Sequence, residues 1–155
     1  MAENTLFKTA LSKAMHQCSQ RELCCSEVEN RLETWGLQRS DRQKIIDTLI
    51  KENFINEERF ALAFVKDKFN HNKWGKIKIK SHLKAKNIPS GIISEALGSI
   101  DNEVYTATIK SVIGSHGRSV KAKNSFEMKA RLLRFGLSRG FESSLLYDIL
   151  NESCG

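Results

Sequence analysis

The chain has 155 residues, of which 40% are hydrophobic, and it contains a single proline. This composition can supply a packed core, and it excludes global disorder, a collagen-like repeat and, with so few turn residues, an all-β fold. The 25 Lys and Arg residues exceed the 18 Asp and Glu residues, and the resulting net charge of +7 favours a polyanionic partner, above all nucleic acid.

Helical periodicity runs through the first third of the chain. Apolar residues recur three and four positions apart over 4–18, and again up to Trp35, just before Gly36, a typical helix stop. A third helix is predicted to begin at Ser40, because Gln43 completes a capping box with it ahead of an apolar run.

The middle third is also predicted to be helical. Asn56 is a suitable cap for a helix over 57–70. The stretch 76–80 alternates lysine and isoleucine, which a strand would also do, but no turn-linked partner strand is near. Leu83 continues the face of Ile79 four residues on, so we predict a helix here.

The last third adds four helices. One opens at Pro89 or Ser90, and Asp101 is predicted to cap the next, over 102–116. The final two are predicted over about 120–135 and 142–150, with only 114–124 irregular. The chain is therefore expected to form about nine helices joined by short connections.

A repeat of about fifty residues underlies these helices. A Gly or Asn, each able to adopt a left-handed backbone, ends one helix and is followed by a large apolar residue. The three pairs are Gly36-Leu37, Asn87-Ile88 and Gly140-Phe141. We predict an all-α fold of three tandem three-helix, helix-turn-helix-like repeats, at 1–55, 56–100 and 101–155, which form an elongated, curved array.

The positive charge is concentrated in two segments. Residues 73–86 contain six lysines and no acidic residue, and residues 117–139 contain seven basic residues and one acidic residue. A run of this kind is either a solvated helix face or a polyanion-binding surface, and two runs in one small chain favour the second. The candidate partner- or nucleic-acid-binding residues are Lys73, Trp74, Lys76, Lys78, Lys80, Lys84, Lys86, Lys121, Lys123, Lys129, Arg131, Arg134 and Arg139.

Helical spacing arranges some of these candidates in ridges. Lys76, Lys80 and Lys84 follow one another at four-residue intervals and are predicted to point outward, away from a buried face. In the other segment, Lys123, Arg131 and Arg134 are predicted to form a similar ridge. Trp74, which precedes the ridge of Lys76, Lys80 and Lys84, is a candidate for stacking on bases.

Metal and enzyme signatures are missing from the sequence. The cysteines at 18, 24, 25 and 154 lack the spacing of a zinc site, so we expect no metal and four reduced thiols, one or two of which fill core space. No motif of a nucleotide-binding enzyme, a metalloprotease or a serine hydrolase is present. Glu57 and Glu58 are adjacent on a helix and point about 100° apart, so they suit a negative first turn rather than a catalytic pair. We expect no enzymatic activity and no cofactor.

No apolar run approaches the ~20 residues that span a membrane. The first eight residues also lack the basic region and apolar stretch of a secretory signal. We therefore expect a cytoplasmic protein that makes no membrane contact.

Four motifs together span most of the chain. They are Arg21-Glu22-Leu23-Cys24 with Glu27, Val28, Arg31 and Leu32; Phe54-Ile55-Asn56-Glu57-Glu58-Arg59-Phe60-Ala61; Trp74-Gly75 with Ile79 and Leu83; and Arg134-Phe135 with Arg139-Gly140-Phe141. In this order and at these spacings, they resemble the RecX family of regulators of the RecA recombinase.

The chain also departs from the family pattern. Cys24 stands where the family usually has a serine, which weakens the helix cap by up to ~1 kcal/mol. Gly136 stands where a leucine is usual, and we expect it to cost packing and helix propensity.

The resemblance implies binding rather than chemistry. It implies a non-enzymatic regulator that lies along the RecA–DNA filament and negatively modulates ATP hydrolysis, strand exchange and coprotease activity, in the control of homologous recombination, DNA repair and the SOS response. The implied partners are the RecA filament and, weakly and in a salt-dependent way, single- and double-stranded DNA, bound by a monomer. The alternative is a stand-alone helix-turn-helix DNA-binding protein. Against this alternative, the predicted basic helix around residues 76–84 offers mostly lysine, which suits phosphate better than base edges.

Overall fold

The computed structural model describes the backbone of residues 2–154 and the side chains of residues 4–152. Within that range the chain forms nine α-helices and no strand, which confirms the all-α prediction. They are α1 Ala2–Gln20, α2 Cys25–Thr34, α3 Arg39–Lys51, α4 Glu57–Asn70, α5 Lys76–Ala85, α6 Ser90–Leu97, α7 Asn102–Gly117, α8 Ser125–Ser138 and α9 Ser143–Cys154. None of them, as far as they are described, has both the length and the apolar character needed to cross a bilayer.

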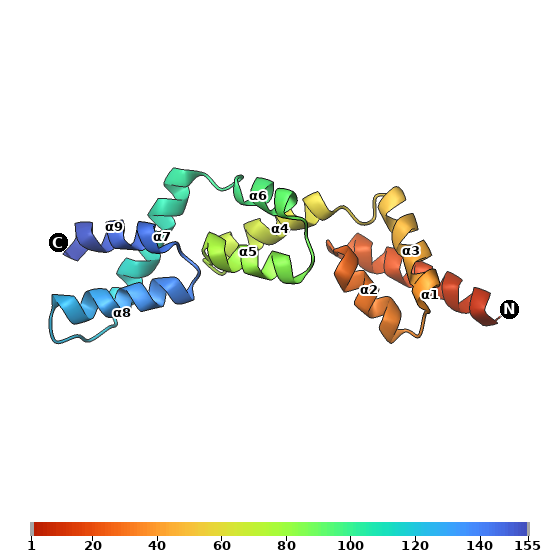
Figure 1. The fold of residues 1–155 in the computed structure, drawn as a ribbon, viewed down its shortest axis with the longest axis horizontal. Coiled ribbons are helices and arrows are strands. Elements are labelled where there is room, and N and C mark those ends of the chain that lie inside the picture. Colours follow the sequence, from red (N-terminus) through yellow and green to blue (C-terminus); the bar gives the residue numbers. More distant parts are fainter. Residues whose placement is uncertain (1, 155) are drawn as a thin grey trace.

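The helices form an elongated row of three groups, with the two chain ends at opposite ends of the row (Figure 1). Helices α1 to α3 form the first group, α4 to α6 the second and α7 to α9 the third. The helix pairs in broad contact, such as α4 with α6 and α8 with α9, all lie within one group. We propose that these groups are the three repeats, with boundaries after residues 55 and 100.

The same helix ending occurs once in each group. Gly36, Asn87 and Gly140 have φ values of 90°, 63° and 91°, so all three adopt the predicted left-handed backbone. In each case the next residue's N–H bonds back to a carbonyl five residues earlier, as Phe141 N does to Gly136 O at 3.1 Å. The apolar residues that follow, Leu37, Ile88 and Phe141, are buried as predicted.

Side chains cap several helix starts where the sequence predicted them. Asn56 Oδ1 accepts from Arg59 N at 2.9 Å, and Asp101 Oδ2 accepts from Val104 N at 3.0 Å. These bonds satisfy N–H groups that have no partner within their own helix.

Two predicted helix starts are wrong. Helix α3 begins at Arg39 with Gln38 as its cap, so Ser40 lies inside the first turn. The left-handed ending of α2 turns the chain so tightly that α3 begins two residues after Leu37. Helix α8 begins at Ser125 rather than near residue 120, because Asn124 Oδ1 accepts from Glu127 N at 2.8 Å and fixes the cap there.

The described part of the chain has two hydrophobic cores rather than three. One belongs to the first group and runs from Ala10 to Ile55. The other takes in Cys24 of the first group and is continuous through the second and third groups, where the Phe69 and Tyr105 rings lie 5.8 Å apart and the Tyr105 and Phe141 rings 6.2 Å apart. The second and third groups are therefore joined by apolar packing.

Candidate nucleic-acid interface

The helix α5 carries the first basic segment and has one buried face. Ile79 and Leu83 are fully buried, as the helical interpretation predicted. Lys80 and Lys84 are exposed one turn apart, and Lys73, just before the helix, is also exposed. These three lysines, called the α5 lysines below, are the part of the predicted site that points into solvent on the second group.

Three other candidates in this segment contact aromatic rings instead. The Trp74 ring is half-buried, and Lys78 Nζ lies 4.5 Å from its centroid. The His82 ring is also 4.5 Å from the Trp74 ring, so little of the indole is left for a base to stack on. Lys76 is half-buried with Nζ 4.6 Å from the Tyr105 ring. Of the predicted outward ridge, Lys80 and Lys84 are exposed, whereas Lys76 contacts Tyr105 of the third group.

The third group binds the start of α5. Gly75 N donates to Arg139 O at 2.7 Å and Ile77 N donates to Gly140 O at 3.0 Å. Between them, Lys76 N donates to the Tyr105 hydroxyl at 2.9 Å, and this hydroxyl donates in turn to Glu142. Burial, followed by the Glu142 carboxylate, raises the pKa of Tyr105. The amides of this helix N-terminus are thus engaged inside the protein and are not free to bind phosphate.

Arg139, another candidate, belongs to the same contact. Its guanidinium donates to Asn72 O and lies 6.0 Å from the Phe135 ring. The side chain is half-buried, so it links the second and third groups rather than facing solvent.

The second basic segment surrounds an open depression of about 740 Å³ between the C-terminal end of α7 and helix α8. Lys121, Arg131 and Arg134 line it and are exposed. Lys123 is exposed on the loop before α8, so the predicted ridge of Lys123, Arg131 and Arg134 is divided between a loop and a helix. Lys129 is half-buried and is not among the residues that line the depression.

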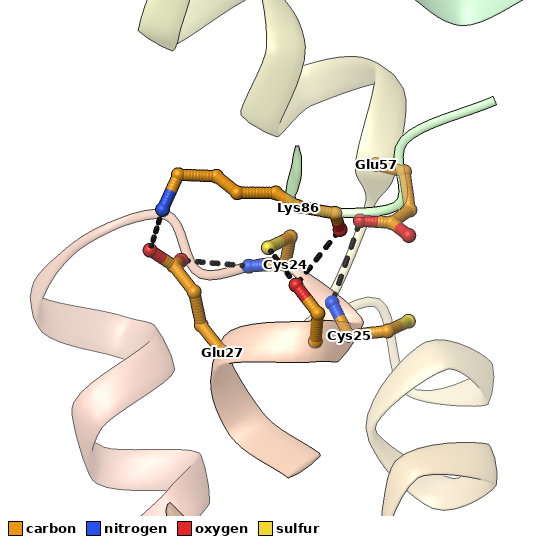
Figure 2. Close-up of polar contacts among 6 residues, drawn as sticks. Cys24, Cys25, Glu27, Glu57 and Lys86 are labelled. Carbon is orange, nitrogen blue, oxygen red and sulfur yellow. Dashed lines mark hydrogen bonds and ion pairs between the residues drawn. The ribbon is translucent and has the colours of Figure 1, made fainter. Parts of the chain in front are cut away.

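Lys86, the last candidate, lies at the joint between the first and second groups (Figure 2). Its Nζ donates to Glu27 Oε2 at 2.9 Å, and its carbonyl accepts from Ser26 Oγ at 2.8 Å. Glu27 Oε1 also accepts from Cys24 N at 3.2 Å, which forms half of a capping box around Cys24. Burial raises the pKa of the Glu27 carboxyl, but the bonds from Lys86 and Cys24 N outweigh it and hold this pKa below its usual value.

Helix α4 completes this first joint. Arg59 Nε donates to Glu22 Oε2 at 2.6 Å, and Cys25 N donates to Glu57 Oε2 at 3.4 Å. Burial, and then the Glu57 carboxylate, raise the pKa of the Cys25 thiol to about 12. The joint between the first two groups is therefore built largely from polar and charged contacts.

The thiols show no metal-site arrangement in the described residues. Cys18, Cys24 and Cys25 are free, and the first two are buried, as expected of thiols that fill core space. The Cys154 side chain lies outside the described residues. Among the side chains described, no group of three His, Cys, Asp or Glu residues could hold a metal ion.

Sequence reasoning missed two contributors to the basic depression. His116 and Phe135 line it, and their rings are stacked with centroids 3.6 Å apart and planes 4° apart. The two residues come from different helices, so no local pattern places them together. The only sequence signal is that Phe135 is next to Arg134 in α8 while His116 lies in the last turn of α7.

Comparison with known proteins gives the chain its relatives. The family model "RecX, second three-helix domain" matches residues 56–97. The Regulatory protein RecX of Clostridium botulinum is 30% identical over 129 residues, which are 82% of this chain and 60% of the relative. That of Lactobacillus johnsonii is 29% identical over 136 residues, 88% of this chain and 50% of the relative. The chain thus spans only half to three fifths of the length of these curated relatives.

Solved structures share the fold. The crystal structure of RecX from Lactobacillus salivarius is similar with a TM-score of 0.83 and 20% identity, over 96% of this chain and 97% of that chain. A second crystal structure of regulatory protein RecX gives a TM-score of 0.87 at 20% identity, over 97% of this chain and 74% of that chain. The solved structures show the shared fold, and the matching second domain together with the named relatives shows that this chain belongs to the RecX family of regulatory proteins.

Proposed function

We propose that this chain binds the filament that RecA forms on DNA and negatively modulates its ATP hydrolysis, strand exchange and coprotease activity without catalysing a reaction itself. The observation that carries this proposal is the combination of an elongated helical row (Figure 1) with cations that are exposed on two successive groups. A long, narrow molecule can follow a groove in a filament, and its cations can neutralise phosphate along the way.

The types of cation support a filament partner more than a sequence-reading role. The α5 lysines are point charges on flexible stems, which suit phosphate oxygens and do not discriminate between base edges. The N-terminus of α5 is engaged by the third group, so this helix does not present its first turn to a major groove as a recognition helix would. Both features count against the stand-alone helix-turn-helix alternative.

The test is the ATPase activity of RecA on single-stranded DNA, measured with and without this protein. We expect ATP hydrolysis to fall as the protein is added, and to fall in the same way on DNA strands of unrelated sequence. A parallel gel-shift with duplexes of varied sequence addresses the alternative. An unchanged ATPase rate, together with a strong preference for one duplex sequence, would contradict the proposal and support the stand-alone DNA binder.

A further inference from the structure

The basic depression in the third group has two walls of different origin. One is a single face of α8, which contributes Arg131, Arg134, Phe135 and Ser138 at helical spacings of three and four. The other is the end of α7 and the turn after it, with His116 and Lys121. Its volume of about 740 Å³ falls within the range of ligand pockets, about 300–1,000 Å³.

An aromatic platform lies in this depression. The His116 and Phe135 rings are parallel and in contact, and both side chains are half-buried rather than enclosed. Phe135 rests against the core shared by the second and third groups, so the platform has a fixed support. A flat ring stack that rests on the core and lines an open depression is suited to accept a further planar ring.

The charges around the platform are of one sign. Lys121, Arg131 and Arg134 are exposed, and no acidic residue lines the depression. Glu127, one turn before Arg131, pairs with it at 2.8 Å. A guanidinium has five N–H donors, so this pair leaves Arg131 with donors for a second anion.

We propose that this depression binds one nucleotide of a single DNA strand, with the phosphates on Lys121, Arg131 and Arg134 and the base stacked on the His116–Phe135 pair. An acidic peptide could use the cations, but its acidic side chains carry no ring to match the platform, whereas every nucleotide combines a phosphate with a planar base. A base in a duplex is already stacked between its neighbours, so only an unpaired strand can offer one. The inference rests on the proposed function only in taking the filament's DNA as the source of the strand.

The experiment separates stacking from charge and uses the whole protein without recombinase. Fluorescence anisotropy compares a labelled oligothymidylate of about 16 nucleotides with an abasic strand of equal length. The two strands carry the same phosphates and differ only in bases. We expect the parent protein to bind the thymidine strand about fivefold or more tightly than the abasic strand.

Three variants test the roles of the rings and of the charge in the depression. His116→Ala should remove the preference for bases while leaving abasic binding unchanged, and His116→Phe, which keeps a ring, should retain the preference. Arg134→Ala should weaken binding to both strands. The controls are His71→Ala and Arg39→Ala, both exposed and away from the depression, which should bind like the parent. Circular dichroism and melting confirm that each variant is folded.

Several results would overturn the inference. One is equal binding of the two strands by the parent. Another is unchanged DNA binding by Arg134→Ala together with loss of binding to DNA-free recombinase, which would make the depression a protein-docking surface. Competition by free thymidine monophosphate as effective as by the strand would identify a free nucleotide as the ligand. Equal binding of the two strands, or equal competition by free thymidine monophosphate, with ATPase inhibition intact would overturn this inference alone, whereas loss of ATPase inhibition with strand binding intact contradicts the proposed function alone.

Discussion

At the scale of single residues, Gly75 and Gly140 lie backbone against backbone where the second and third groups meet. A Cβ placed on Gly75 would lie 2.2 Å from the carbonyl carbon and oxygen of Gly140. Gly75 has φ −78°, which any residue can adopt, so it is the absence of a side chain that matters there. Position 140 requires glycine for two reasons: its φ is +91°, and a Cβ there would lie 2.3 Å from the Cβ of Lys78.

We predict that Gly75→Ala destabilises the protein by about 2 kcal/mol or more, because the clash is with backbone that cannot move without breaking the Gly75–Arg139 hydrogen bond. The matched control is Gly91→Ala in α6, where a Cβ meets nothing within 4 Å and alanine gains up to about 1 kcal/mol of helix propensity. Urea unfolding of both variants measures this. Equal free energies of unfolding in urea for Gly75→Ala and the parent would contradict the described contact.

Gly136 affects the packing between α8 and α9 differently from what the sequence predicts. A Cβ there would lie 2.5 and 2.8 Å from the two terminal carbons of Leu146, so the glycine makes room for Leu146 between α8 and α9. The expected packing loss is therefore wrong: the leucine that is usual in the family would need Leu146 to move. The cost in helix propensity remains.

The raised pKa of the Cys25 thiol predicts that this thiol reacts slowly in the folded protein. Its pKa is raised to about 12, first by burial and then by Glu57, so the folded protein holds almost no Cys25 thiolate at pH 8. We expect iodoacetamide to label Cys25 far more slowly in the folded protein than in the urea-unfolded chain, measured by peptide mass spectrometry. Rapid labelling in the folded state at pH 8 would show that the thiol is not shielded as described.

At the scale of elements, the first joint depends on how α5 ends. Lys86 is the C-cap residue of α5 and pairs with Glu27 in the first turn of α2, and both side chains are mostly buried. We predict that Lys86→Met costs about 1 kcal/mol of stability at neutral pH, because it leaves a partly buried carboxylate without its partner. Thermal melting measures the loss, and binding of RecA and DNA should change little.

The pH dependence tests the cause of that loss. The folded-state pKa of Glu27 is lowered, so the pair contributes stability above the unfolded pKa of about 4.3, and this contribution is lost as the pH falls through the folded value. The difference in melting temperature between parent and Lys86→Met should therefore shrink in acid. A difference that stays constant down to pH 2 would assign the loss to packing of the lysine stem instead.

Local patterns in the sequence predict the helices well and the joints poorly. The spacing of Ile79 and Leu83, the caps at Asn56 and Asp101, and the left-handed endings at Gly36, Asn87 and Gly140 each depend on residues within a turn or two. The Tyr105 hydroxyl bound to Lys76 N, by contrast, joins residues 29 positions apart. No periodicity encodes such a contact, and for the same reason the sequence counted Lys76, Lys86 and Arg139 as surface cations.

At the scale of the whole molecule, the four family motifs lie at the two joints between groups. The first motif supplies Glu22, which pairs with Arg59 of the second, and the third supplies Gly75, whose N–H binds Arg139 O of the fourth. The first joint is largely polar, whereas the second is part of a continuous hydrophobic core. The motifs therefore contribute contacts that fix how the groups are placed in the row.

We expect inhibition to depend on where the exposed lysines lie along the row and not only on the total charge. We expect Lys73, Lys80 and Lys84 changed together to Glu to abolish inhibition of the RecA ATPase, because all three are exposed on one group and would repel phosphate. Lys76 is left unchanged, since a carboxylate beside Tyr105 and its partner Glu142 would damage the second joint. Folding should be unaffected, which circular dichroism and melting check.

The matched control changes Lys8, Lys44 and Lys51 to Glu, three exposed lysines of the first group, and lowers the net charge by the same amount. We expect it to keep most of the inhibition. For the parent, inhibition should weaken steeply as salt rises from about 50 to 200 mM, because bound phosphates release counterions. Equal loss in both triple variants would mean that only net charge matters. Full inhibition by the Lys73, Lys80 and Lys84 variant would make the α5 lysines a solvated face, and the third group would then carry the contact.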